Sequence, residues 1–569
     1  MNSETKNCQN CKKDFIIEPD DFLFYEKIKV PPPTFCPECR LTRRFFWRNE
    51  HIFYKNTCVL CKKNLVTNNS PLNKFPIYCY DCWHSDKWDG GKYEREYDFS
   101  RPFFEQWHNL LQVTPNINLW GLGNVNCDYS NYTGYSKNAY LSVATNCEDV
   151  YYSKLVDKSK NLFDCYITFD SNYCYENFSS NKNWNSSFLN NCVNCIDSEF
   201  LFDCKNCNNC FMCSGLRNKS FFIRNKQYNK DEYLEKLKSY KISSFVNIED
   251  FKLEFNSLIK KSIHKFAHIL NSVNSTGDDI FFSKNAKNSF VVTNSENVRY
   301  CWRIFNGIKD CYDMTGSLNN ELCYESSLGA DGGYLTKFFS ISRGNKNTEL
   351  VHLCINCNYC FGCVGLKSKQ YCILNKQYTK DEYEELVPKI IKHMSDMPYI
   401  DSKGRVYKYG EFFPTELSPF CYNETIAQEY FPLTKEEAIS QGYRWKDKEE
   451  RNYNIDIYNK NIPDNITDIT DDITDKIIEC AHKGECNQQC TEAFKIIPEE
   501  LQFYRRMNLP IPRLCPNCRH YERLSQRNPL KLWHRKCMKE GCTNEFETSY
   551  SPERSEIIYC ERCYQNEVY

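Results

Sequence analysis

The chain has 569 residues, and its 73 basic and 74 acidic side chains leave a net charge of −1 at neutral pH. This length allows roughly three to five domains, and the balanced charge excludes a polyelectrolyte that attracts its partner through overall charge alone. No apolar run approaches the roughly 18–20 residues that a membrane-spanning helix requires, so we expect no transmembrane helix and no membrane partner.

The 36 cysteines indicate metal binding in a reducing compartment. Secreted disulfide scaffolds are usually short and begin with an apolar signal peptide, whereas the first residues here are polar. Many of the cysteines form Cys-x2-Cys pairs, and this spacing suits a tetrahedral metal site. We therefore expect a cytoplasmic protein whose thiols are reduced and bind metal.

Two segments, 1–95 and 476–569, carry four close cysteine pairs each, and the three gaps between the pairs agree to the residue. Four thiolates form one tetrahedral Zn²⁺ site. Each segment therefore predicts a tandem zinc-ribbon unit with two ions, and the chain about four ions. The predicted ligands are Cys8, Cys11, Cys36, Cys39, Cys58, Cys61, Cys79, Cys82, Cys486, Cys490, Cys515, Cys518, Cys537, Cys542, Cys560 and Cys563.

The pairs of one unit can share their ions in two ways. A sequential arrangement joins the first pair to the second and the third to the fourth, whereas an interleaved arrangement joins the first to the third; we favour the sequential one. In both, the second pair of each site is expected on a distant hairpin. Cys480 and His482 lie close to Cys486 and either could replace it, although we interpret Cys480 as a free thiol.

A connecting helix is predicted over 96–115, where apolar residues recur at helical spacing. The segment 116–245 then repeats short phrases in which Asn or Asp precedes an aromatic residue or cysteine, in steps of 11 or 12 residues. Such a period is typical of stacked repeats. We expect one strand and one turn per repeat, and two repeats, about 22–23 residues, per coil of a parallel β-solenoid.

A second solenoid block, 278–395, repeats the end of the first at an offset of 150 residues. Each block is expected to end in a capping helix with a capping box, and an amphipathic helix is expected between the blocks at 246–277. Both blocks contain four cysteines at a spacing of three, interpreted as a ladder of buried thiols or as ligands that raise the total to six ions. They are Cys204, Cys207, Cys210, Cys213, Cys354, Cys357, Cys360 and Cys363.

The segment 396–450 is rich in proline and aromatic residues, and 451–475 is acidic and low in complexity, so we predict a linker there. The expected fold class is mainly β, with small tandem zinc ribbons at both ends flanking a two-block parallel β-solenoid with capping helices.

Arginines concentrate between the second and third cysteine pairs of each terminal unit. Zinc ribbons that carry arginine and aromatic side chains commonly contact phosphates and stacked bases. The alternatives are a protein or intramolecular acidic partner, or a solvated helix face. The candidates for nucleic-acid binding are Arg40, Arg43, Arg44, Arg48, Arg519, Arg523 and Arg527.

Three phrases resemble an uncharacterised multi-cysteine zinc-ribbon family of candidate-phyla bacteria: Cys-Pro-Glu-Cys-Arg at 36–40, Phe-Gly-Cys-Val-Gly-Leu at 361–366 and Leu-Pro-Ile-Pro-Arg-Leu-Cys-Pro at 509–516. Some members carry the name of a CaiB/BaiF-type CoA-transferase, but nothing in this sequence is similar to the catalytic aspartate region of that fold. The resemblance implies zinc and this architecture, and it implies no activity.

The sequence contains no Gly-rich phosphate loop, HExxH or GxSxG motif, so we lean towards a non-catalytic protein. We expect a zinc-binding scaffold that binds nucleic acid, with RNA or the ribosome favoured, and we identify no small-molecule substrate. The alternatives are a protein-interaction scaffold and a β-solenoid carbohydrate-active enzyme, for which Asp310, Asp313 and Asp331 are weak candidates.

Overall fold

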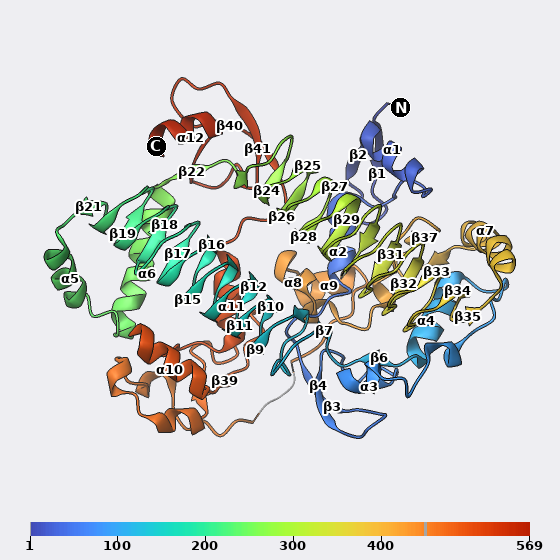
Figure 1. Ribbon diagram of the computed structural model, residues 1–569, viewed down its shortest axis with the longest axis horizontal. Helices are drawn as coiled ribbons and strands as arrows, with labels where there is room; N and C mark the ends of the chain where they lie inside the picture. Colours follow the sequence, from blue (N-terminus) through green and yellow to red (C-terminus); the bar gives the residue numbers. More distant parts are fainter. Residues whose placement is uncertain (1, 330, 449–451, 569) are drawn as a thin grey trace.

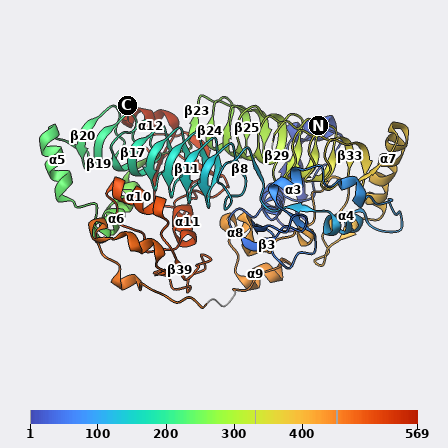
Figure 2. The same cartoon turned by 60° about the horizontal axis from the view of Figure 1, so that its bottom comes forward.

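The computed structural model describes residues 2–329, 331–448 and 452–568. Two β blocks form a long row, and the two ends of the chain pack together with the 396–448 segment along one side of it (Figure 1, Figure 2). The described residues contain twelve α-helices and many short strands. The protein is therefore mainly β, which confirms this part of the prediction. No helix among the described residues has the length and apolar character needed to cross a bilayer.

The first block is a curled sheet of 15 strands, in which all neighbours run parallel except the last pair, β20 and β21. Its strands are β7 (Gly121–Leu122), β8 (Thr133–Gly134), β9 (Lys137–Tyr140), β10 (Val143–Thr145), β11 (Glu148–Tyr151), β12 (Lys154–Asp157), β13 (Lys160–Phe163), β14 (Tyr166–Phe169), β15 (Asn172–Tyr175), β16 (Phe178–Asn181), β17 (Trp184–Asn190), β18 (Glu199–Phe202), β19 (Asn208–Ser214), β20 (Ser220–Ile223) and β21 (Lys226–Gln227).

The second block is built in the same way from 13 strands, with β34 and β35 as its antiparallel end. Its strands are β23 (Ile269–Leu270), β24 (Gly277–Phe281), β25 (Lys284–Lys287), β26 (Ser289–Thr293), β27 (Glu296–Arg299), β28 (Trp302–Ile304), β29 (Lys309–Ser317), β30 (Tyr324–Ser326), β31 (Lys337–Ser340), β32 (Glu349–His352), β33 (Asn358–Phe361), β34 (Gln370–Ile373) and β35 (Lys376–Gln377).

One coil of the first block contains about 12 residues. Val150 of β11 pairs with Leu162 of β13, and Val156 of β12 pairs with Thr168 of β14, so each strand meets its neighbour at an offset of 12. The expected coil of 22–23 residues was therefore wrong. One repeat of the sequence is a complete coil with two short strands, and not half of a coil.

The small coil depends on a left-handed backbone conformation that recurs at every third residue. Asn161, Asp164, Ile167 and Asp170, for example, all have φ between 50 and 55°. This conformation is unfavourable for most L-residues, but Asn and Asp tolerate it because their side chains form local hydrogen bonds. The Asn161 amide donates to Oδ1 of Asn172 in the next coil at 3.0 Å. Stacked amides of this kind explain the repeated Asn that the sequence shows.

The interior of each coil is filled by small buried side chains, including the central cysteines. The Cys192 sulfur lies 3.4 Å from the Asn190 carbonyl oxygen and 3.3 Å from that of Leu201, and most thiols of both runs repeat this pattern. These contacts give the thiols acceptors within the coil and favour the ladder interpretation. The Cys207 sulfur also lies beside those of neighbouring cysteines, so metal binding by the central runs stays a prediction.

The helices cap and brace the blocks. α5 (Lys230–Ser239) and α7 (Lys380–Asp396) follow the last strands of the two blocks, and both begin with the predicted capping box. α4 (Phe103–Val113) lies within the predicted connecting helix and begins after Pro102. α6 (Phe245–Lys261) covers only the first part of the predicted 246–277 helix, because the chain then enters β22 (Ile263–Lys265) and β23.

The predicted acidic linker is packed against the molecule over its described residues, 452–475. Ile466, Ile469 and Ile473 are buried in the same apolar cluster as Phe503. The four aspartates of the two 3-10 turns beside them are exposed. The low complexity of this segment thus reflects a repeated apolar contact every three or four residues, and the linker prediction was wrong.

The two terminal units pack on the blocks in a crossed order. Phe24 of α1 (Pro19–Lys27) stacks on Tyr312 of the second block with ring centroids 3.9 Å apart. Phe503 of α10 (Pro498–Met507) stacks on Phe163 of the first block at 4.0 Å. The half of the N-terminal unit that contains α1 therefore lies on the second block, and the half of the C-terminal unit that contains α10 lies on the first (Figure 1).

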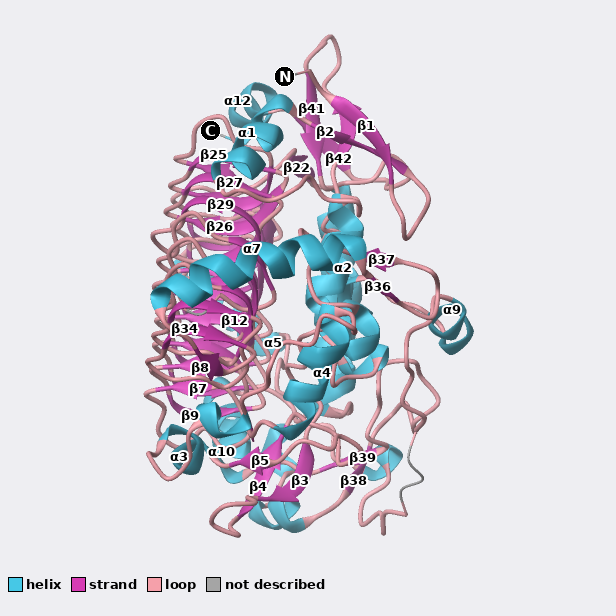
Figure 3. Cartoon of the chain, turned by 90° about the vertical axis from the view of Figure 1, so that its right-hand side faces the viewer, coloured by secondary structure: helices cyan, strands magenta, loops and turns pink. Residues whose placement is uncertain are grey.

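Seen along the row, the strands form one layer and the helices that face them form another (Figure 3). In this view α2 (Pro37–Phe45) and α4 lie in the second layer, and α9 (Lys435–Ser440) lies outside it. The other helices are α3 (Tyr80–His84), α8 (Ile426–Tyr430), α11 (Pro516–Ser525) and α12 (Glu561–Val568). The remaining strands are β1 (Glu4–Asn7), β2 (Asp14–Ile17), β3 (Tyr54–Thr57), β4 (Asn64–Thr67), β5 (Ile77–Tyr78), β6 (Asn116–Ile117), β36 (Tyr399–Ile400), β37 (Val406–Tyr407), β38 (Ile478–Glu479), β39 (Ala493–Phe494), β40 (Trp533–Lys536), β41 (Glu545–Thr548) and β42 (Ile557–Tyr559).

Candidate metal centres and the helices that carry them

The structure brings the cysteines of the terminal units together in groups of four. Within each group all four sulfurs lie within 4.8 Å of one another, as a single metal ion requires. The pairs combine in sequential order and not in the interleaved order. The groups of four cysteines in the terminal units are Cys8, Cys11, Cys36 and Cys39; Cys58, Cys61, Cys79 and Cys82; Cys480, Cys490, Cys515 and Cys518; and Cys537, Cys542, Cys560 and Cys563.

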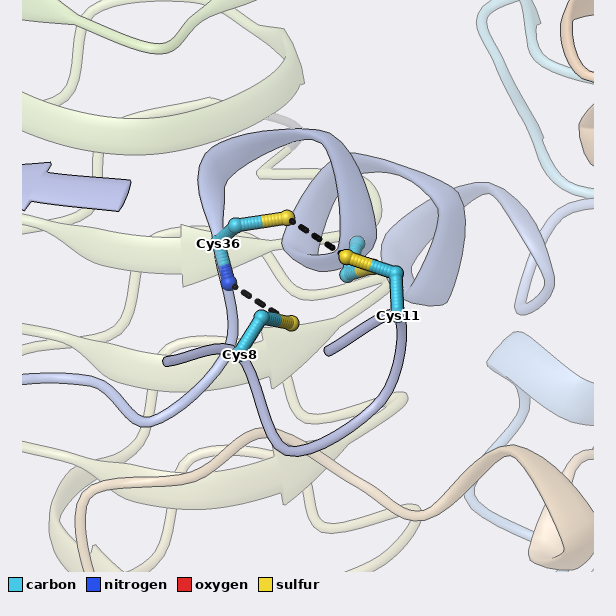
Figure 4. A group of neighbouring side chains, drawn as sticks. Cys8, Cys11 and Cys36 are labelled. Carbon is cyan, nitrogen blue, oxygen red and sulfur yellow. Dashed lines mark hydrogen bonds between the residues drawn. The ribbon is translucent and has the colours of Figure 1, made fainter. Parts of the chain in front are cut away.

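Each group combines the turn of a β-hairpin with the first turn of a helix. Cys8 and Cys11 lie in the turn between β1 and β2, Cys36 is the N-cap of α2, and Cys39 lies in its first turn. Figure 4 shows the sulfurs of Cys8, Cys11 and Cys36 converging from these two elements. The prediction of a second hairpin was wrong, because Pro37 follows Cys36 and proline at the first helical position favours helix initiation.

The helix start stabilises the thiolate form of the opposing cysteines. In all four groups the backbone N–H of the third cysteine donates to the sulfur of the first, at 3.2–3.3 Å. Burial raises the pKa of Cys58, but backbone N–H groups of Cys61 and Cys79 outweigh burial and lower it to about 6. Thiolates are the form that binds metal, and helix N-termini favour them.

The third group contains Cys480 in the place where the sequence predicted Cys486. Cys480 directly follows β38 as Cys8 follows β1, and the Cys515 N–H donates to its sulfur. Cys486 lies outside the group, although its sulfur is 3.7 Å from that of Cys518, and with His482 it forms an overlapping set of donors. A nine-residue loop replaces the usual two-residue spacer here. The signal that identifies Cys480 is the apolar pair Ile477–Ile478 shortly before it, whose second residue begins strand β38.

This assignment predicts different metal contents for two neighbouring serine variants. We expect Cys480→Ser to lose about one metal ion per chain, because the remaining three thiolates no longer complete a tetrahedral structural site. Cys486→Ser should keep the full metal content. Elemental analysis of reduced, dialysed protein measures both, and loss of the ion from Cys486→Ser alone would contradict the geometry.

The predicted nucleic-acid arginines are mostly buried, so this assignment of a phosphate-binding surface was wrong. The side chains of Arg40, Arg43, Arg44 and Arg48 are exposed by 2% or less, and those of Arg519 and Arg523 by 4–5%. Arg527 is half-buried, with its guanidinium 3.7 Å from the centre of the Tyr430 ring. Five of them lie in α2 or α11 and pair with carboxylates hundreds of residues away in the chain, namely Arg40, Arg43, Arg44, Arg519 and Arg523.

The arginines of α2 and α11 pair with one buried aspartate in each β block. Arg40 and Arg44 donate to Asp313 of β29 at 2.9 and 2.7 Å. Arg519 and Arg523 donate to Asp164, which follows β13, at 2.9 and 2.5 Å. Both aspartates are fully buried. The two helices therefore make the same contact with the two blocks.

The duplicated terminal cysteine unit and the duplicated β block meet at this contact. Cys36, Cys39, Arg40 and Arg44 of α2 are separated from one another as Cys515, Cys518, Arg519 and Arg523 of α11 are. Each helix thus joins two candidate metal ligands to two arginines, and each aspartate lies at a left-handed corner of its coil. The cysteine groups and the buried ion pairs are parts of one arrangement that occurs twice in the chain.

Further buried ion pairs extend the contact on the N-terminal side. Arg43 donates to Glu325 of β30 at 2.6 Å and to Glu411 at 2.8 Å. Of the acidic residues considered for carbohydrate chemistry, Asp313 is held by its two arginines, and Asp310 accepts from Lys27. Asp331 accepts from the amide of Asn319. Each of the three thus has a partner within the fold.

Comparisons with known proteins do not assign a family. No family model matches the chain, and no curated protein matches it. One solved structure that matches is a "putative acetyltransferase" from Desulfovibrio desulfuricans G20, which is 9% identical and covers 51% of this chain and 86% of that chain. Its TM-score of 0.11 is too low to support an argument about fold or activity.

Proposed function

We propose that the protein is a zinc-binding, non-catalytic scaffold in which metal-held terminal units brace two parallel β-solenoid blocks. The observation that carries this proposal is the double use of α2 and α11. Each helix contributes two cysteines to a group of four thiols and two arginines to a buried aspartate of a block.

Zinc is the metal that fits these groups best. Four cysteine sulfurs form a closed tetrahedral site, which is typical of structural Zn²⁺ and leaves no open position for a substrate. Because cysteine thiolates also suit iron, the ion must be identified by measurement. Binding of a structural zinc ion contributes folding free energy directly, so small units with few apolar residues can depend on it.

The β-solenoid supplies the rigid part of the scaffold in this proposal. The 12-residue register, the left-handed corners and the helices at the block ends support it. The buried arginines favour the intramolecular acidic partner among the three readings of the basic segments. For an external partner, a protein is therefore favoured over RNA, since the arginines expected to bind phosphate are already paired.

Metal content per chain tests the proposal. We expect about four zinc ions per chain in reduced protein purified without chelators, because four closed groups of thiols are present. Iron in place of zinc, or about two ions per chain, would contradict it. About six ions would add the central cysteine runs as further sites.

A further inference from the structure

A fifth thiol lies beside the third group of cysteines. The Cys486 sulfur is 3.7 Å from that of Cys518, as close as the 3.9 Å that separates the sulfurs of Cys480 and Cys518 within the group. His482 also places a ring nitrogen within 4.8 Å of the sulfurs of Cys486 and Cys518. A tetrahedral ion binds only four of the five sulfurs. One thiol of this cluster is therefore left over when the metal is bound.

The loop between the first two cysteines of the third group places this fifth thiol. The Lys483 N–H donates to the Cys480 carbonyl at 2.9 Å, and the Glu485 N–H donates to the His482 carbonyl at 2.8 Å. These two turns fold the loop back on itself. Cys486 follows directly and so lies beside the first turn of α11.

The hairpin turns of the other three groups contain no further cysteine. The residues between their first two cysteines are 9–10, 59–60 and 538–541, and none of these is a cysteine. A fifth thiol inside the turn is therefore a property of the third group among the four.

Exposure distinguishes Cys486 from the other thiols of the cluster. Its side chain is half-buried, whereas those of Cys480, Cys490, Cys515 and Cys518 are buried. A hydroperoxide in solution therefore meets the Cys486 sulfur first. Oxidation of cysteine depends on exposure, and a second thiol close by converts the first oxidation product to a disulfide.

We propose that Cys486 is an oxidation site through which a hydroperoxide releases the metal ion of the third group. The hydroperoxide takes two electrons from the Cys486 thiol, which becomes a sulfenic acid, while the O–O bond breaks and an alcohol or water leaves. The Cys518 thiolate then attacks the Cys486 sulfur. The S–S bond forms, the S–O bond breaks, and the hydroxide that leaves takes up a proton and becomes water.

The disulfide removes one ligand from the metal. The sulfurs of Cys486 and Cys518 must approach from 3.7 Å to the roughly 2.0 Å of an S–S bond, and the loop that carries Cys486 can supply this movement. A disulfide sulfur is no longer the thiolate that binds metal. Three thiolates do not complete a closed tetrahedral site, so the ion leaves. This inference rests on the proposed zinc binding.

Loss of this ion reaches the contact between α11 and the first β block. Cys518 directly precedes Arg519, which donates to Asp164 of that block at 2.9 Å. When Cys518 is drawn towards the loop, the first turn of α11 loses its metal and moves away from the block. Oxidation should therefore loosen the C-terminal unit and leave the N-terminal unit in place.

Zinc release from the full-length, reduced and zinc-loaded protein tests this inference. Hydrogen peroxide is added in thiol-free buffer, free zinc is measured with a colorimetric indicator, and disulfides are mapped by mass spectrometry. We expect the first ion, about one per chain, to leave as the disulfide between Cys486 and Cys518 forms, and to rebind after reduction with dithiothreitol. Zinc that stays bound in protein with this disulfide would overturn the proposed release.

Two serine variants test the role of Cys486. Cys486→Ser should bind as much zinc as the unmodified protein but lose the first ion roughly tenfold more slowly, because the accessible thiol is gone. Cys127→Ser is the matched control, because Cys127 is also half-buried but lies in the first β block. It should release zinc at the unmodified rate. Equal rates in Cys486→Ser and the unmodified protein would overturn the inference.

The metal content before oxidation separates this inference from the proposed function. Reduced protein without zinc would contradict the proposed function. Zinc-loaded protein whose first disulfide joins other cysteines would overturn the oxidation site alone. The disulfide map of the unmodified protein decides this point even if Cys486→Ser does not fold.

Discussion

Replacing Asp313 with asparagine should destabilise the contact between α2 and the second block by about 3–5 kcal/mol, because the change leaves two buried guanidiniums without a charged partner. Arg40 and Arg44 both depend on this carboxylate and lie within 3 Å of it. Asparagine keeps the size of the side chain and tolerates the left-handed corner at position 313. The measured loss of stability therefore reports the effect of removing the charge of Asp313 alone.

The same strand supplies a matched control. Asp310 is also an aspartate at a left-handed corner of β29, but its partner Lys27 is more than half exposed. Asp310→Asn should cost under about 1 kcal/mol, as exposed pairs usually do. Hydrogen exchange of amides in α2 and β29 gives the free energy of local opening for both variants. Equal costs in the two variants would show that the buried pairs do not hold the helix.

Removing the metal should open the terminal units unevenly. The hairpin of β40 and β41 has mostly exposed side chains, so it has little apolar contact to hold it without an ion. The segment of α2 and its C-terminal extension instead buries Phe45, Phe46 and Trp47, and burial of each side chain stabilises the fold by about 1.5–3 kcal/mol. We expect the hairpin to unfold and α2 to stay near the block with a frayed first turn.

Hydrogen exchange with a strong chelator in reducing buffer measures this difference. Amides of 533–548 should lose nearly all protection, those of 37–40 should lose part of it, and coil amides such as those of 200–213 should change least. The same chelator saturated with zinc is the control for effects other than metal removal. Full protection of 533–548 in metal-free protein would contradict a structural role for the ion.

Much of this arrangement can be predicted from the sequence, because cysteine spacing directly reflects ligand geometry. Pairs such as Cys8 and Cys11 lie in tight hairpin turns, and the equal gaps identify the duplicated unit. Cys480 was considered as a replacement for Cys486 but interpreted as a free thiol, because nine residues separate it from Cys490. The repeated Asn was visible, but the coil size was not, since about half of the non-glycine left-handed corners carry residues such as Ile167 that give no signal.

The burial of the arginines could not be predicted from local patterns. Arg40 and Arg519 look like surface residues of basic segments, and their partners Asp313 and Asp164 lie in the β blocks. Only the three-dimensional arrangement shows that each copy of the terminal unit contacts one β block through the same kind of buried ion pair. A related signal was present in the sequence, because these aspartates occupy corresponding positions in the two blocks.

The central claim is that a metal group and a buried ion pair act together through the helix they share. The most direct test measures the cost of Asp313→Asn twice, in zinc-loaded and in metal-free protein, from hydrogen exchange of β29 amides. The cost should fall by about 1–3 kcal/mol without metal, because coupled neighbouring elements are not additive. If the cost is the same in both states, the metal does not help to hold Arg40 and Arg44 on the block.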